Sequence, residues 1–130
     1  MIQRNYNLQN LIAPNKVLVL YGPRQAGKTT LLEHFLQTTT LKYKLESGDD
    51  LHFQKILGSQ SIETIRQYAQ GYDLIAIDEA QRIPNVGWGL KILVDHVPSI
   101  QVIATGSASF DLSYKIGEPL VGRSVTKILY

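Results

Sequence analysis

Hydrophobic residues form short runs along the chain, and longer amphipathic stretches separate these runs. Three runs are continuous and contain many β-branched residues, which is typical of strands buried on both faces of a parallel sheet. They lie at residues 17–21, 74–77 and 101–105. Weaker patterns at residues 43–46 and 125–130 predict two further strands.

The stretches between the runs carry apolar residues at helical spacing. They predict helices over residues 28–38, 51–57, 62–70 and 86–97, with a short helix at 109–116. Asp or Ser before residue 51 can cap the second of these helices, and we interpret Trp88 as a packing residue. Alternating strands and helices predict an α/β fold, a three-layer αβα sandwich around a mainly parallel sheet of about five strands.

Composition restricts the function classes. With 130 residues, 44% of them hydrophobic and 18% charged, the chain has the composition of one globular domain. It has no cysteine, so disulfides, thiolate metal sites and catalytic thiols are excluded. A net charge of +2 does not indicate a nucleic-acid partner. We expect a cytoplasmic protein with no membrane partner, because the sequence shows neither a signal-peptide pattern nor an 18-residue apolar run.

A glycine-rich motif follows the first predicted strand and opens the first long helix. The residues Gly22, Pro23, Arg24, Gln25, Ala26, Gly27, Lys28 and Thr29 match G-x-x-x-x-G-K-[ST] at every fixed position. Glycines let backbone N–H groups converge on phosphate oxygens, and the helix N-terminus adds partial positive charge. We therefore predict a P-loop NTPase fold, with Lys28 on the β- and γ-phosphates and the Thr29 hydroxyl on Mg²⁺. Thr30 completes the predicted phosphate-binding set, and Arg24 either contacts phosphate or faces solvent.

An acidic pair directly follows the second buried run. Ligands of open α/β sheets bind at the carboxyl ends of the strands, so Asp78 and Glu79 are expected to face the same crevice as the glycine motif. There Asp78 is predicted to hold Mg²⁺, directly or through water, in the Walker B role. Glu79 is predicted to act as the general base that polarises the attacking water.

Two other polar features have both a functional and a structural interpretation. Thr105-Gly106-Ser107 ends the third buried run, where a hydroxyl could contact the γ-phosphate or orient the water, or could simply belong to a turn. Arg123 is a candidate for an arginine that stabilises the γ-phosphate, although most arginines are only solvated.

Four stretches together resemble a family. YGPRQAGKTTLL (residues 21–32), IAIDEAQRIPN (75–85), ATGSASF (104–110) and PLVGRS (119–124) are similar to prokaryotic AAA-superfamily ATPases with an AAA domain of the AAA_14 type. In that family the AAA domain is followed by a C-terminal domain of unknown function. The resemblance covers nearly the whole chain, and its last three motifs are more specific than the glycine motif.

The resemblance implies an ASCE-type sheet, in which the strand of the catalytic glutamate lies between the P-loop strand and the edge strand. It places Ser107 at the sensor-1 position and implies that Arg123 is an arginine finger acting in trans within a homo-oligomer. It also implies ATP as the nucleotide. We expect residues 1–130 to be the ATPase core and the N-terminal fragment of a longer protein, because the chain ends within a predicted strand.

The residues leave three functions open. The first is an ATPase module that couples ATP hydrolysis to a further domain or partner. The second is an ATP-dependent binding switch with negligible turnover, which has less need for a base at Glu79. The third is a P-loop small-molecule kinase, which would require an acceptor pocket and an arginine-rich lid.

Overall fold

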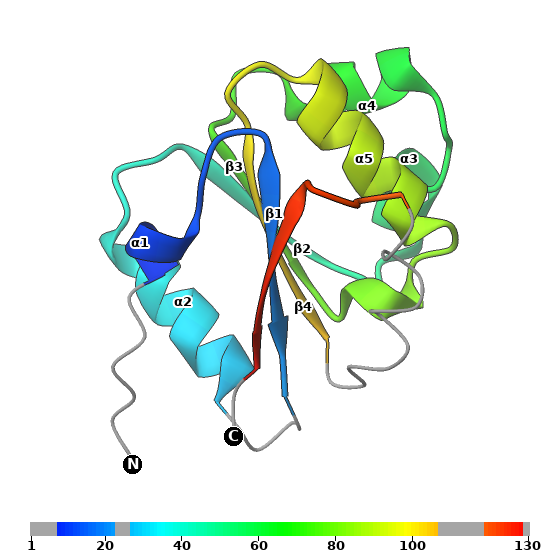
Figure 1. The fold of residues 1–130 in the computed structure, drawn as a ribbon. Helices are drawn as coiled ribbons and strands as arrows, with labels where there is room; N and C mark the ends of the chain where they lie inside the picture. Colours follow the sequence, from blue (N-terminus) through cyan, green and yellow to red (C-terminus); the bar gives the residue numbers. More distant parts are fainter. Residues whose placement is uncertain (1–7, 23–26, 107–118, 129–130) are drawn as a thin grey trace.

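The middle layer of the fold is a parallel sheet (Figure 1). The computed structural model describes residues 8–22, 27–106 and 119–128. Within these residues the strands are β1 (Lys16–Tyr21), β2 (Tyr43–Ser47), β3 (Leu74–Asp78), β4 (Gln101–Gly106) and β5 (Ser124–Ile128). Their spatial order is β2-β3-β4-β1-β5, and every neighbouring pair is parallel. This confirms the predicted α/β fold and the position of the Asp78 strand between the glycine-motif strand and the edge strand.

The central strands are apolar because helices cover both faces of the sheet. Along β1, Val17 and Val19 face one hydrophobic core, and Leu18 and Leu20 face the other. All four side chains are at most 1% exposed. Burial of one such side chain contributes about 1.5–3 kcal/mol, so these positions favour a central strand strongly. The edge strands β2 and β5 are half exposed, which explains their weaker sequence patterns.

Helices of different segments form the two outer layers (Figure 1). One face is covered by α1 (Leu8–Leu11) and α2 (Lys28–Thr38), and the other by α3 (Leu51–Leu57), α4 (Ile62–Ala69) and α5 (Val86–His96). Side chains cap two of these helices, because Asp50 accepts from the backbone of His52 and Phe53, and Ser61 accepts from that of Thr64. Among the helices of the described residues, none combines the length and the apolar composition that a membrane span requires.

Most predicted elements are present, with small shifts at their ends. The helix α1 and the short 3₁₀ helix η2 (Ala80–Arg82) were not predicted, because both are too short to show a periodic pattern in the sequence. The interpretation of Trp88 as a packing residue is wrong, since its side chain is 48% exposed while Gly89 and Leu90 face the interior. The predicted helix at 109–116 lies outside the described residues.

The strand order brings three loop segments to one edge of the sheet. Tyr21 at the end of β1 pairs with Gly106 at the end of β4. On the other side of β4, Ala104 pairs with Ile77 of β3. Ile77 is the residue directly before the acidic pair. Because the strands are parallel, the glycine motif, the acidic pair and the segment after Thr105 all emerge at the carboxyl edge.

Candidate functional site

The beginning of α2 provides the first part of the site. Gly27 is the N-cap residue and has a φ of 82°, a left-handed conformation that glycine adopts without steric cost. A glycine brings no side chain to the first-turn N–H groups, which have no partner within the helix. Lys28 is 3% exposed, whereas Thr29 and Thr30 are exposed to solvent.

The other residues of the glycine motif are described only in part. Gly22 is buried directly after β1. Pro23, Arg24, Gln25 and Ala26 lie outside the described residues, so their phosphate contacts stay predictions. The strand, glycine and helix that flank them have the arrangement that the motif requires.

One threonine hydroxyl connects the ends of β3 and β4. Thr105 Oγ1 donates to Asp78 Oδ1 at 2.5 Å and accepts from the backbone N–H of Glu79 at 3.2 Å. Its side chain is fully buried, so these bonds form away from competing water. A hydrogen bond to a carboxylate is stronger than one between neutral groups, and this one restrains the orientation of Asp78.

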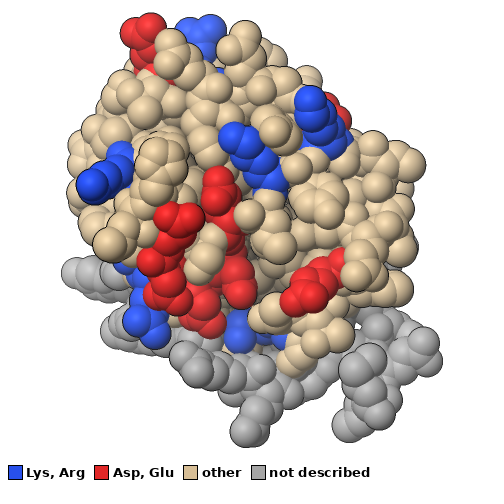
Figure 2. Space-filling view, turned by 180° about the vertical axis from the view of Figure 1, so that it is seen from behind, with Lys and Arg blue, Asp and Glu red and all other residues tan. Residues whose placement is uncertain are grey.

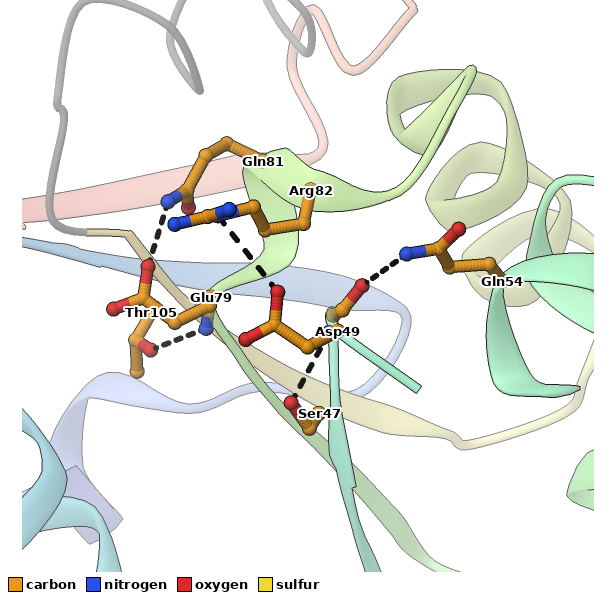
Figure 3. A network of polar contacts seen from close by, with 8 residues as sticks. Ser47, Asp49, Gln54, Glu79, Gln81, Arg82 and Thr105 are labelled. Carbon is orange, nitrogen blue, oxygen red and sulfur yellow. Dashed lines mark hydrogen bonds and ion pairs between the residues drawn. The ribbon is translucent and has the colours of Figure 1, made fainter. Parts of the chain in front are cut away.

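Glu79 has a strained backbone, and a neighbouring side chain restrains its carboxylate. Figure 3 shows the contact between Glu79 and Gln81. Its φ of 55° and ψ of 49° lie in the left-handed region, which costs a residue with a Cβ about 1 kcal/mol or more. The side-chain amide of Gln81 donates from Nε2 to Glu79 Oε2 at 2.6 Å. Strained residues that the surrounding structure holds in place cluster at functional sites, which makes Glu79 a candidate on structural grounds as well.

Gln81 is a site residue that was not predicted from the sequence. Its side chain is only 7% exposed, although glutamine is normally a surface residue. The available signal was its place in D-E-A-Q, where a polar residue lies between Ala80 and Ile83, both fully buried. Thr105 lay within a predicted stretch, but its bonds to both acidic residues could not be derived from spacing.

The loop after β2 supports Glu79 from the other side (Figure 3). The Gly48 N–H donates to the Asp78 carbonyl at 2.7 Å. A Cβ added to Gly48 would lie 1.9 Å from the Glu79 carbonyl oxygen, so only glycine fits here. Gln54 Nε2 donates to the Gly48 carbonyl at 2.6 Å and holds the loop in turn. The Glu79 backbone therefore packs between the end of β4 and the loop after β2.

A pocket of about 210 Å³ joins the beginning of α2 to the end of β3. Its lining includes Thr29 and Asp78, the two predicted Mg²⁺ ligands, together with the carboxylates of Glu33 and Glu46. Acidic side chains gather in the lower half of the face that Figure 2 shows. No three His, Cys, Asp or Glu side chains of the described residues lie close enough together to hold a metal ion by themselves. The pocket therefore suits an ion such as Mg²⁺, which takes one or two protein oxygens and completes its shell with phosphate and water.

Tyr68 of α4 orients one of these carboxylates. Its hydroxyl donates to Glu46 Oε2, and its ring packs against Phe53 and lies under the Lys44 ammonium at 4.0 Å. Burial raises the pKa of the Tyr68 hydroxyl far above its ordinary value, and the hydrogen bond to Glu46 raises it further. Tyr68 therefore stays protonated and continues to donate to Glu46 throughout the physiological pH range.

Arg123 lies at the opposite end of the sheet from the pocket. Its carbonyl accepts from the Val17 N–H at 2.8 Å, at the beginning of β1. The segment from Val17 to Tyr21 spans about 13 Å at the usual rise per residue, and Lys28 lies beyond its far end. The guanidinium is 45% exposed and pairs with Asp95 at 3.2 Å. Ser107, the predicted sensor, lies outside the described residues.

Comparisons with known proteins agree with this fold. The family model AAA_14, which describes an AAA domain, matches residues 14–130. Two uncharacterized proteins, from Mycobacterium bovis and Mycobacterium tuberculosis, are each 34% identical to this chain over 108 residues. The match covers 82% of this chain but 23% of each mycobacterial protein, so the chain spans less than a quarter of their length.

A solved structure has the same fold at lower sequence identity. It is a structure of katanin, described as the structural basis of katanin self-assembly, and it superposes with a TM-score of 0.57. The likeness covers 88% of this chain and 41% of the katanin chain, with 21% identity. At that identity the comparison shows a shared fold.

Proposed function

Because the chain belongs to the AAA domain family, a family of nucleotide-binding domains, we propose that it binds ATP with Mg²⁺ and hydrolyses it. The observation that carries the proposal is the shared pocket of Thr29 and Asp78 at the carboxyl edge of the sheet. It joins the helix of the glycine motif to the strand of the acidic pair. These two elements supply phosphate binding and metal binding in P-loop enzymes.

The residues of the pocket fit Mg²⁺. This ion is usually held by one or two protein ligands, with phosphate oxygens and water completing an octahedron. The Thr29 hydroxyl and the Asp78 carboxylate offer that number of protein ligands, and Thr105 restrains the carboxylate. When bound, the ion would neutralise charge that develops on the phosphates. Lys28, at the first position of α2, would contribute the second positive charge, on the β- and γ-phosphates.

Glu79 is the proposed general base. It directly follows Asp78, so its side chain extends from the same strand end. A base must reach the attacking water within about 2.6–3.2 Å, and this demands a side chain with little freedom. The Gln81 bond and the left-handed backbone supply that restraint. In the proposed reaction the Glu79 carboxylate takes a proton from the water that attacks the γ-phosphorus, and ADP leaves.

Arg123 is proposed to complete the site of a neighbouring copy. The length of β1 separates Arg123 from Lys28, so the same chain cannot supply both without a large rearrangement. An arginine in trans can stabilise the charge on the transferred phosphoryl group. The described self-assembly of katanin is consistent with such an arrangement, although that property belongs to katanin.

We extend the proposal to the longer proteins in which this domain occurs. The mycobacterial relatives are more than four times as long as the matched segment, so the domain is only one part of them. We propose that the nucleotide state of the domain controls an attached domain or a partner. The sequence also leaves open an ATP-dependent switch. That alternative predicts ATP binding with negligible ATP hydrolysis, whereas this proposal predicts both.

The test is Mg²⁺-dependent ATP hydrolysis, measured beside ATP binding. We expect thermal stabilisation by ATP with Mg²⁺, and phosphate release that EDTA stops. In Lys28→Ala both effects should be lost, because the buried ammonium no longer meets the phosphates. An unchanged stabilisation in that variant would refute the P-loop assignment. Binding that depends on Lys28 without any phosphate release would support the switch instead.

A further inference from the structure

We propose that Gln81 is a positioning residue for the Glu79 carboxylate. The inference rests on the proposed function, because it assigns to Gln81 the orientation of the base in ATP hydrolysis. The observation that supports it is the hydrogen bond from Gln81 Nε2 to Glu79 Oε2, at 2.6 Å. At this length, and with an ionised acceptor, the bond belongs to the strong class.

The backbone holds Gln81 firmly. It lies in η2, the 3₁₀ turn directly after Glu79, and its side chain is 7% exposed. The flanking residues Ala80 and Ile83 are fully buried and anchor the turn in the core. Because the turn cannot rotate without exposing these two side chains, the Gln81 amide is held beside the Glu79 carboxylate. The glutamate, by contrast, has three side-chain torsions and would otherwise sample several rotamers.

A primary amide can orient a carboxylate through a hydrogen bond without transferring a proton to it. Its N–H groups only donate, so the bond from Nε2 to Glu79 Oε2 restrains the orientation of that carboxylate. A general base works only when its lone pair is aligned with the proton it removes. A misplacement of about 1 Å can reduce a rate about 100-fold, so loss of the bond should act on the chemical step. The affinity for nucleotide should hardly change.

The chain offers a matched control. Gln67 Nε2 donates to the carboxylate of Glu63 at 3.4 Å, on the exposed surface of α4. This bond involves neither Glu79 nor the loop after β2. Gln67→Met and Gln81→Met therefore remove the same group and replace it with a side chain of similar length. Only the second substitution should affect the Glu79 carboxylate.

The experiment measures kcat, KM and the dissociation constant for Mg-ATP in the whole 130-residue chain. In Gln81→Met, kcat should fall about 10- to 100-fold while the dissociation constant changes less than about three-fold. In Gln67→Met, kcat should stay close to that of the wild type. Where Gln81→Met does not fold, Gln81→Glu keeps the size and places a second carboxylate against the first, and it should lower kcat at least as much.

A double-substitution cycle separates positioning from general damage. In a Glu79→Gln background, the Gln81→Met change should have little further effect on the residual rate, because no base remains to be positioned. An equal, additive loss in that background would overturn the proposal, as would an unchanged or higher kcat in Gln81→Met. If the wild type released no phosphate at all, the hydrolysis proposal would fail first and this one with it. Full wild-type turnover with an unaffected Gln81→Met would refute the positioning role alone.

Discussion

The Thr105 hydroxyl lies 2.5 Å from a carboxylate oxygen of Asp78, on the neighbouring strand. The same hydroxyl accepts the backbone N–H of Glu79. One buried side chain on β4 therefore restrains both acidic residues at the end of β3, Asp78 and Glu79. Thr105 therefore connects the proposed metal ligand, Asp78, with the proposed base, Glu79. A substitution at Thr105 should alter the position of both.

Thr105→Val should destabilise the fold and weaken Mg-ATP binding. Valine has the shape of threonine but lacks the hydroxyl, so the Glu79 N–H loses its partner and the Asp78 carboxylate loses a donor. A buried polar group left without a partner costs about 1–3 kcal/mol. Urea unfolding should show a loss of that size, and titration with Mg-ATP should show a higher dissociation constant.

The control for this prediction is Thr126→Val on β5. Thr126 is exposed on an edge strand, away from the acidic pair. This variant should unfold within about 0.5 kcal/mol of the wild type. If Thr105→Val were equally harmless, the two hydrogen bonds would contribute nothing to the site.

Glu79→Gln should keep nucleotide binding and lose turnover. Glutamine has nearly the same shape, but its amide cannot accept a proton from water at neutral pH. A general base typically contributes about 10²–10⁴ in rate, so kcat should fall by that factor. Binding of Mg-ATP, followed by thermal stabilisation, should persist. Turnover at the wild-type rate would remove Glu79 from the role of base.

Gly48→Ala should damage the site although residue 48 is itself neither a predicted ligand nor a predicted catalytic residue. The new Cβ would approach the Glu79 carbonyl oxygen to 1.9 Å and its carbon to 2.8 Å, and both are backbone atoms that cannot turn aside. Overpacking of this kind costs about 1–3 kcal/mol and shifts the neighbouring backbone. We expect lower stability in urea together with a reduced kcat.

Gly71→Ala distinguishes a local effect from lost stability. Gly71 has a φ of 84° and lies in the turn before β3, at the far end of the strand from Asp78. An alanine there is strained by about 1 kcal/mol, but its Cβ would meet no atom within 4 Å. The variant should lose stability and keep its kcat. An equal loss of kcat in both variants would contradict the specific role of Gly48.

The sequence predicted what depends on local pattern. The runs at β1, β3 and β4 are buried on both faces, so burial and sequence indicate the same elements. The glycine motif and the acidic pair were predicted because their positions after buried strands match known phosphate- and metal-binding motifs. Gly48 and Gln54 could not be found in this way. Their roles depend on the distance between two loops, and tertiary packing sets that distance.

Asp95 should stabilise the fold at neutral pH and lose this effect in acid. The hydrogen bond from Lys91, with the charges of Lys91 and Arg123, holds the pKa of the Asp95 carboxyl below its ordinary value of 3.8. The stabilisation is therefore present above pH 3.8 and is lost as the pH falls through the lowered value. Asp95→Asn should cost less than about 1 kcal/mol at pH 7, as expected for a surface pair. Urea unfolding should show the difference narrowing below about pH 4.

Arg123→Ala should abolish the part of ATP turnover that depends on protein concentration. Arg123 lies at the opposite end of the sheet from the pocket. In the proposed arrangement a second copy supplies it, so the rate per chain should rise as the copies assemble. An arginine finger is worth about 10³–10⁵ in rate, and its loss should flatten the concentration dependence. Lys91→Ala is the matched control, because Lys91 pairs with the same Asp95 at 2.8 Å. Both variants lose one ion pair of Asp95, so a loss of turnover common to both would indicate damage to this surface. A loss confined to Arg123→Ala, with Mg-ATP binding intact, would identify the arginine itself as the group supplied in trans.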